Sequence, residues 1–132
     1  MSTLARLLRP KSIAVVGGGA WCANVIKASE GIGFTGDIWP VHPSKPEIAG
    51  KKTFADIDAL PSAPDATFLG VNRHATIECL SSLSKRGAGG AVCFASGFAE
   101  ASAELADGAD MQAQLLRAAG DMTILGPNCY GV

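Results

Sequence analysis

The stretch that most constrains the fold runs from Ser12 to Trp21 and reads SIAVVGGGAW. Ile13 to Val16 form an apolar, β-branched run without alternation, which is typical of a strand covered on both faces in a parallel sheet. Three glycines follow at once, and because they lack Cβ atoms the backbone can turn sharply and approach a bound phosphate. A helix that begins just after them points its free N–H groups at the same anion. The stretch predicts a strand, a glycine turn and a helix beside a phosphate-binding pocket.

The remaining chain repeats this alternation of strand and helix. Apolar runs predict four further strands, at residues 37–41, 66–71, 91–95 and 122–125. Apolar residues at helical spacing predict helices at 4–8, 21–32, 75–86 and 107–118, and residues 47–64 read as a connection with one short helix. Pro40 cannot donate to a ladder, so its strand is short or lies at an edge there. The order predicts an α/β fold, a Rossmann-type doubly wound parallel sheet of about five strands with helices on both faces.

Composition narrows the class of protein. With 132 residues, of which 48% are hydrophobic and 17% charged, the chain is expected to form one domain, residues 1–132. A net charge of −1 gives no basic footprint for nucleic acid, and no apolar run is long enough to cross a membrane. The N-terminal residues have too little apolar sequence for a signal peptide, so a cytoplasmic protein with a small-molecule ligand is expected.

The cysteines give no sign of a metal site. Cys22, Cys79, Cys93 and Cys129 are scattered, without a CxxC pair or a neighbouring histidine. That spacing argues against zinc and against a disulfide framework. We expect reduced thiols, mostly buried, since free cysteine is among the most buried residue types. Cys129 is the exception, because it lies on a loop at the rim of the expected pocket.

Ligands of doubly wound sheets bind beyond the carboxyl ends of the strands. Five loops of this chain are expected at that edge, at residues 17–21, 42–45, 72–74, 96–100 and 126–130. A dinucleotide fingerprint counted from Gly17 and Gly19 places Cys22 at its third glycine, so this motif alone is a weak signal for NAD.

The second strand indicates the kind of nucleotide. NAD requires an acidic residue where this strand ends, but Asp37 stands at its start and the strand is followed by His42, Pro43 and Lys45. A cation at that place favours a phosphorylated ribose, as in NADP or in the 3′-phospho-ADP of coenzyme A.

Taken together, the segments of the chain resemble a known family. In order they read PKSIAVVG, GFTGDIWPVHP, EIAGKKTF, DALPSAPDATFLGV, AVCFASGFAE and LGPNCYGV. They resemble the CoA-binding domain of NDP-forming acyl-CoA synthetases and of the succinyl-CoA synthetase α subunit. The resemblance covers nearly the whole chain, and GFAE and GPNC are its most specific parts.

The resemblance implies a set of cofactor-binding residues and no catalytic one. The glycine turn would cradle the CoA phosphates, the loop after strand two would approach the adenosine, and the last three strand ends would follow the pantetheine to the thiol. In that order, the matching residues are Gly17, Gly18 and Gly19; His42, Pro43 and Lys45; Val71, Asn72 and Arg73; Ser96, Gly97 and Glu100; and Pro127, Asn128 and Cys129.

This chain departs from the family pattern at several of these positions. The glycine loop is shorter, so Trp21 follows almost immediately and could be a core plug, an adenine platform or a lid. Ser44 stands where the family has a lysine, so Lys45 would reach from the next position. Asn72 and Arg73 replace proline and alanine, which brings a cation to a place where the family is neutral.

The resemblance also implies what the chain lacks. Those synthetases pass a phosphoryl group through a histidine on a second domain and use an ATP-grasp domain, and neither fits into 132 residues. We therefore expect a CoA- or acyl-CoA-binding module, the N-terminal domain of a longer acyl-CoA ligase, that is not catalytic alone and works with phosphohistidine and ATP-grasp domains of the same or a partner chain. The alternatives are an NADP-dependent oxidoreductase domain, although no Tyr-x-x-x-Lys dyad is visible, and a non-catalytic nucleotide-binding sensor.

Overall fold

The computed structural model describes residues 3–93, 113–114, 117–120 and 122–125, and five of its strands form one sheet. All four pairings in this sheet are parallel, in the order β2-β1-β5-β6-β7. Because the order reverses at β1, the sheet is doubly wound, as predicted. The strands are β1 (Ser12–Val16), β2 (Asp37–Val41), β5 (Ala66–Leu69), β6 (Gly90–Cys93) and β7 (Thr123–Leu125).

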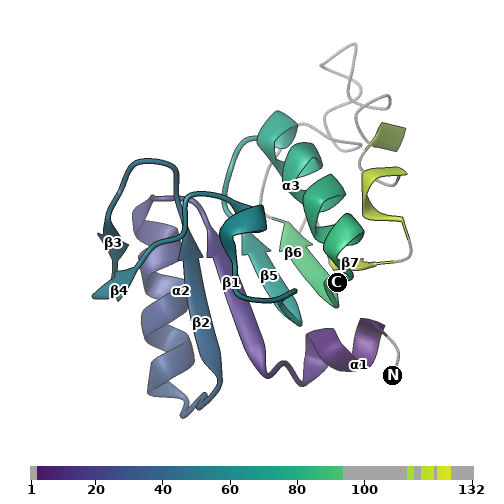
Figure 1. Ribbon diagram of the computed structural model, residues 1–132. Coiled ribbons are helices and arrows are strands. Elements are labelled where there is room, and N and C mark those ends of the chain that lie inside the picture. Colours follow the sequence, from purple (N-terminus) through teal and green to yellow (C-terminus); the bar gives the residue numbers. More distant parts are fainter. Residues whose placement is uncertain (1–2, 94–112, 115–116, 121, 126–132) are drawn as a thin grey trace, which may run out of the picture.

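The central strand β1 shows why the sheet is covered on both faces. All five of its residues are buried. Ile13 and Val15 pack into one apolar cluster with Ile26 of α2 (Ala20–Gly31), whereas Ala14 and Val16 pack into another with Leu80 of α3 (Arg73–Arg86). Alternate side chains of a strand point to opposite faces. Helices therefore lie on both faces of the sheet, as expected (Figure 1).

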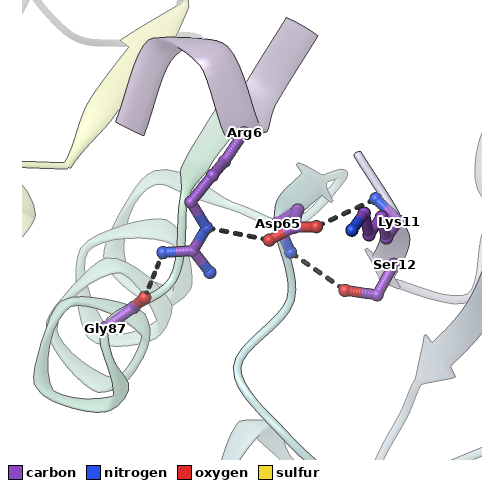
Figure 2. A network of polar contacts seen from close by, with 5 residues as sticks. All are labelled: Arg6, Lys11, Ser12, Asp65 and Gly87. Atoms are coloured by element: carbon purple, nitrogen blue, oxygen red, sulfur yellow. Dashed lines mark hydrogen bonds and ion pairs between the residues drawn. The ribbon is translucent and has the colours of Figure 1, made fainter. Parts of the chain in front are cut away.

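The short N-terminal helix α1 (Thr3–Leu8) lies near the amino ends of the strands and contacts β5, β6 and β7. Its Arg6 donates from Nε to Asp65 Oδ1 at 2.8 Å and from a guanidinium nitrogen to Gly87 O at 2.7 Å (Figure 2). The other Asp65 oxygen accepts from Lys11 N at 2.9 Å, and Asp65 N donates to Ser12 Oγ at 3.1 Å. The network joins the helix to the segments that enter β1 and β5.

Helix boundaries follow their local capping residues. α3 begins at Arg73, two residues before the predicted start, because the Asn72 carboxamide oxygen accepts from Ala75 N at 2.9 Å and caps the helix. It ends as predicted at Gly87, which adopts φ 79°. The helix predicted over 107–118 falls largely outside the described residues, of which 113–114 and 117–119 are helical.

The prediction for residues 47–64 was incomplete. This segment holds a short antiparallel hairpin, β3 (Glu47–Ile48) and β4 (Lys51–Lys52), followed by the 3-10 helix η1 (Ile57–Ala59). Ala49 and Gly50 form the turn with φ of 51° and 80°, and such turns are usually signalled by Asn-Gly. Between hairpin and η1, Phe54 forms a parallel bridge with Val41, so β2 is the edge strand of the main sheet but is flanked by this segment.

None of the helices in the described part of the chain has the length and apolar character needed to span a membrane.

Candidate functional site

The glycine turn after β1 lies tightly against its neighbours. Gly17 has φ 127°, and a Cβ atom placed on it would lie 2.7 Å from Gly70 O and 2.9 Å from Cys22 Sγ. Gly17 N donates to Val41 O at 3.1 Å, and Gly70 N donates to Val16 O at 2.9 Å. Only glycine fits such a position, since both the backbone angle and the space exclude a side chain. The turn therefore sits where the carboxyl ends of β1, β2 and β5 meet.

Cys22 occupies the place of the third glycine of a dinucleotide fingerprint. Its buried Sγ donates to Val16 O at 3.5 Å and lies 2.8 Å from where a Gly70 Cβ would be. A thiol is tolerated there because the two residues that face it, Gly17 and Gly70, have no side chains. Burial raises the pKa of Cys22 and outweighs the hydrogen bond from the Gly19 backbone and the charge of Lys45. The thiol is a packing group in its protonated form.

His42 is held against the glycine turn. Its Nδ1 accepts from Lys45 N at 2.9 Å and from Ser44 N at 3.1 Å. With Nδ1 acting as the acceptor, the neutral ring carries its hydrogen on Nε2. A Cβ on Gly18 would lie 2.6 Å from both Nε2 and Cδ2, so the ring edge packs directly on that glycine. His42 thus presents an N–H donor beside the turn.

Lys45 connects the second loop to the first. Its Nζ donates to Gly18 O, and its Cδ lies 3.2 Å from where a Gly18 Cβ would be. The side chain reaches the turn although it comes one position later than the family lysine. A positive charge and a ring N–H donor therefore converge on Gly18, beside the first turn of α2. This grouping suits phosphate oxygens.

A cleft of about 550 Å³ opens from the turn across the carboxyl edge of the sheet. One side is formed by Gly17, Gly18, His42 and Pro43, and its floor includes Val16, Val41, Gly70 and Val71. The opposite side comes from residues 55–58 around η1 and from one face of α3, through Ala75, Glu78, Cys79 and Ser82. A volume of this order is typical of sites for small molecules and cofactors.

The structure brings together part of the predicted site. Gly17, Gly18, His42, Pro43 and Val71 line the cleft, and Lys45 is bonded to Gly18. Gly19 is the N-cap of α2 and Trp21 its second residue, whereas Asn72 caps α3 and Arg73 is its first residue. Six predicted residues lie outside the described part of the chain, namely Ser96, Gly97, Glu100, Pro127, Asn128 and Cys129. All the assigned binding roles stay predictions.

The acidic side of the cleft was not anticipated. Asp56, Asp58 and Glu78 contribute three carboxyl groups to the lining, and Asp56 also caps η1 by accepting from Ala59 N at 2.9 Å. The residues of α3 are spaced i, i+3, i+4, i+7, which the sequence alone could have marked as one helix face. The η1 side could not be found that way, because the long-range bridge between Phe54 and Val41 sets its position.

Cys79 differs from the expectation for a core thiol. Cys22 and Cys93 are buried, but Cys79 is only half-buried and lines the cleft. Burial raises its pKa to about 11, and the neighbouring Glu78 charge adds to the effect. A thiol that stays protonated at neutral pH is a poor nucleophile. Cys79 is therefore not set up as a nucleophile at neutral pH.

The fold defines the chain as an α/β domain of the Rossmann type, and the glycine-turn cleft lies where such domains bind nucleotides. Comparison with known proteins is more specific: residues 11–132 match the CoA binding domain family, and the chain belongs to it. The resemblance to acyl-CoA synthetases is confirmed, and the comparisons give no support to an NADP-dependent oxidoreductase.

Two curated relatives are synthetases. The chain is 38% identical to a trans-feruloyl-CoA synthase from an unknown prokaryotic organism, over 96% of this chain and 18% of the relative. It is 31% identical to the ADP-forming acetate–CoA ligase II of Archaeoglobus fulgidus, over 96% of this chain and 19% of the relative. The chain thus spans less than a fifth of these relatives' length.

Among solved structures, the apo form of the dinucleotide-forming acetyl-coenzyme A synthetase 1 of Ca. Korarchaeum cryptofilum is similar, with a TM-score of 0.82 and 27% identity. The match covers 95% of this chain and 28% of that one.

Proposed function

We propose that this chain holds CoA or acyl-CoA for a longer NDP-forming acyl-CoA synthetase. Membership of the CoA binding domain family supports the ligand, and the names of the relatives support the class of ligase. The observation that carries the proposal is the convergence of Gly18, His42 Nε2 and Lys45 Nζ at one end of the cleft.

The charges of the cleft determine the orientation in which CoA binds. Its phosphates bind at the glycine turn, where the first turn of α2 offers N–H groups and where Lys45 supplies a positive charge. Asp58 and Glu78 repel phosphate from the opposite side, which is left for uncharged groups of the ligand. The pantetheine then runs along Val71 towards the expected position of Cys129.

The bond-making groups of the reaction lie elsewhere in this proposal. Thioester formation coupled to a nucleoside triphosphate needs a phosphorylated intermediate, which the family carries on a histidine of a second domain and forms with an ATP-grasp domain. Both would belong to the same longer chain or to a partner, in keeping with the share of the relatives that this chain spans. The chain contributes the binding and orientation of CoA.

A ligand panel tests the choice of cofactor. Thermal unfolding is measured with CoA, acetyl-CoA, dephospho-CoA, NADP, NAD and ADP. A ligand at 100 times its dissociation constant adds about 2.7 kcal/mol, and the unfolding midpoint rises by about 5–10 °C in a domain of this size. A rise with NADP and none with CoA would contradict the proposal.

Lys45 gives a residue-level test. Lys45→Met should raise the CoA dissociation constant about tenfold, the effect of one lost charge-assisted bond, measured by isothermal titration calorimetry. The matched control is Lys52→Met, which removes an exposed lysine from the hairpin strand β4, outside the cleft lining. Equal CoA affinity in Lys45→Met and wild type would show that Lys45 does not contact the ligand.

A further inference from the structure

The amino ends of the strands form a second surface, which we call the foot of the sheet, at the edge opposite the CoA cleft. Two large apolar side chains are exposed there, Leu8 at 66% and Ile32 at 87%. Leu8 also lines a cleft of about 620 Å³ together with Ala5, Arg6, Arg9, Lys11 and Asp65. Single exposed apolar residues are ordinary on a protein surface, so a contact surface is inferred from the charges that surround these two.

One half of the foot, around Leu8, is basic. Arg6 already donates hydrogen bonds to Asp65 and to Gly87 O, and both carboxylate oxygens of Asp65 accept hydrogen bonds (Figure 2). Arg9 and Lys11 are exposed, and neither forms an ion pair with any described residue, although the charge of Lys11 also lowers the pKa of Asp65. Three cations therefore stand against the single carboxylate of Asp65, and the net charge around Leu8 is positive.

The other half of the foot, around Ile32, carries the opposite charge. Ile32 follows the last residue of α2, and Asp37 begins β2 with an exposed side chain that has no ion-pair partner among the described residues. Glu30 is also exposed, but it pairs with Lys51 at 3.4 Å. Asp37 therefore supplies the uncompensated negative charge of this half.

The two halves meet at the start of β1. Asp37 N donates to Lys11 O at 3.1 Å, and Ser12 pairs with Asp37 in the ladder. Lys11 and Asp37 are thus neighbours at the centre of the foot. Helix α1, which ends at Leu8, lies to one side of this centre, and the carboxyl end of α2, next to Ile32, lies to the other (Figure 1). A two-fold axis through this centre would place the basic half of one copy on the acidic half of another.

We propose that the foot is the interface of a homodimer. Lys11 of each copy faces Asp37 of the other, and Leu8 of each copy packs against Ile32 of the other. A two-fold axis forms every such contact twice, as in isologous dimers. A foot that carries both signs of charge complements a second copy of itself, whereas a uniformly basic foot would suit an acidic partner. The CoA clefts face away from this interface and stay open.

Sedimentation velocity at concentrations from about 1 µM to about 1 mM tests the proposal. The mass should rise from 13.4 kDa towards twice that value as the concentration increases. Lys11→Glu and Asp37→Lys should each raise the dimer dissociation constant about tenfold or more, because each places like charges face to face. The double variant should restore dimerisation. Lys52→Glu makes the same charge change on β4 and should leave dimerisation unchanged.

Leu8→Ser tests the apolar contact without changing charge, and it also should weaken the dimer. A chain that stays at 13.4 kDa throughout would overturn the proposal, as would single variants whose losses the double variant does not restore. CoA titration of the same samples keeps the two proposals apart. A monomer that binds CoA refutes only the dimer, and a dimer that does not bind CoA refutes only the proposed function.

Discussion

The contact between Gly18 and His42 allows a quantitative test of how the glycine turn is built. In Gly18→Ala, the new methyl group would lie 2.6 Å from His42 Nε2 and Cδ2, closer than real Cβ contacts allow. Gly18 is outside the left-handed region, so the backbone accepts alanine and the cost comes from the ring. The ring must move, and it is held by two hydrogen bonds from Ser44 N and Lys45 N to Nδ1.

The size of the effect follows from those two bonds. Each is worth about 0.5–1.5 kcal/mol net, so displacing the ring should lower the free energy of unfolding by about 1–3 kcal/mol. His42→Ala removes the same bonds and also removes the atoms that collide. In the His42→Ala background, Gly18→Ala should therefore cost only a few tenths of a kcal/mol, which gives a coupling energy of about 1–3 kcal/mol.

Urea unfolding of wild type, both single variants and the double variant, without ligand, measures this coupling. Gly31→Ala is the control, because a Cβ at Gly31 meets nothing within 4 Å. An equal cost of Gly18→Ala in both backgrounds would refute the argument, since the alanine would then be destabilising for a reason unrelated to the imidazole.

Three further predictions concern other parts of the molecule. Asn72→Ala removes the cap of α3 and should cost about 1 kcal/mol in urea unfolding, whereas Asn72→Asp should keep the cap; equal losses in both would contradict a capping role. Burial alone would raise the pKa of Asp65, but hydrogen bonds from Lys11 N and Arg6, with the charges of both residues, hold it below 3.8. A lowered pKa stabilises the fold above the unfolded-state value and loses that effect as pH falls through the folded-state value, so Asp65→Asn should be less stable by about 1–2 kcal/mol at pH 7 and the gap should close below about pH 3.8. A pH-independent gap would mean that the carboxylate charge contributes nothing. Because the pKa of Cys79 is about 11, iodoacetamide should modify this thiol slowly at pH 7.5 and faster towards pH 10, as followed by mass spectrometry. At either pH, saturating CoA should slow the modification, since Cys79 lines the cleft. A rate that CoA does not change would mean that the ligand binds elsewhere.

The architecture could be predicted because its signals are local. The unbroken apolar run of β1 reflects a strand buried on both faces, and Pro40 predicted a strand that is short or lies at an edge, of which the second holds for β2. Glycine at position 87 likewise marked the end of α3. In each case, one residue type or one short run is compatible with few backbone arrangements.

The features that the sequence did not explain depend on contacts between distant segments. Cys22 is buried, as expected, but the reason why a thiol fits after the glycine turn lies in Gly70, far along the chain. The turn of the β3–β4 hairpin has Ala49 in the left-handed region, and alanine is not a residue type that predicts such a turn. The acidic side of the cleft depends on the bridge between Phe54 and Val41.

Asn72 illustrates a different limit. The family pattern predicts Asn72 on the path of the pantetheine, and the structure shows in addition that its carboxamide oxygen caps α3. A polar residue before a helix is compatible with both roles, and the cap could be predicted only if the start of the helix were known.

The bridge at Phe54 also affects how copies of this chain can aggregate. Phe54 N donates to Pro40 O at 2.9 Å, His42 N donates to Phe54 O at 2.9 Å, and Pro40 has no N–H to offer. The outer side of β2 at residues 40–42 therefore lacks the free donors and acceptors that a strand from another molecule needs in order to extend the sheet. The segment that begins at Phe54 thus prevents another strand from pairing with residues 40–42, and its next residues, 55–58, form one side of the cleft.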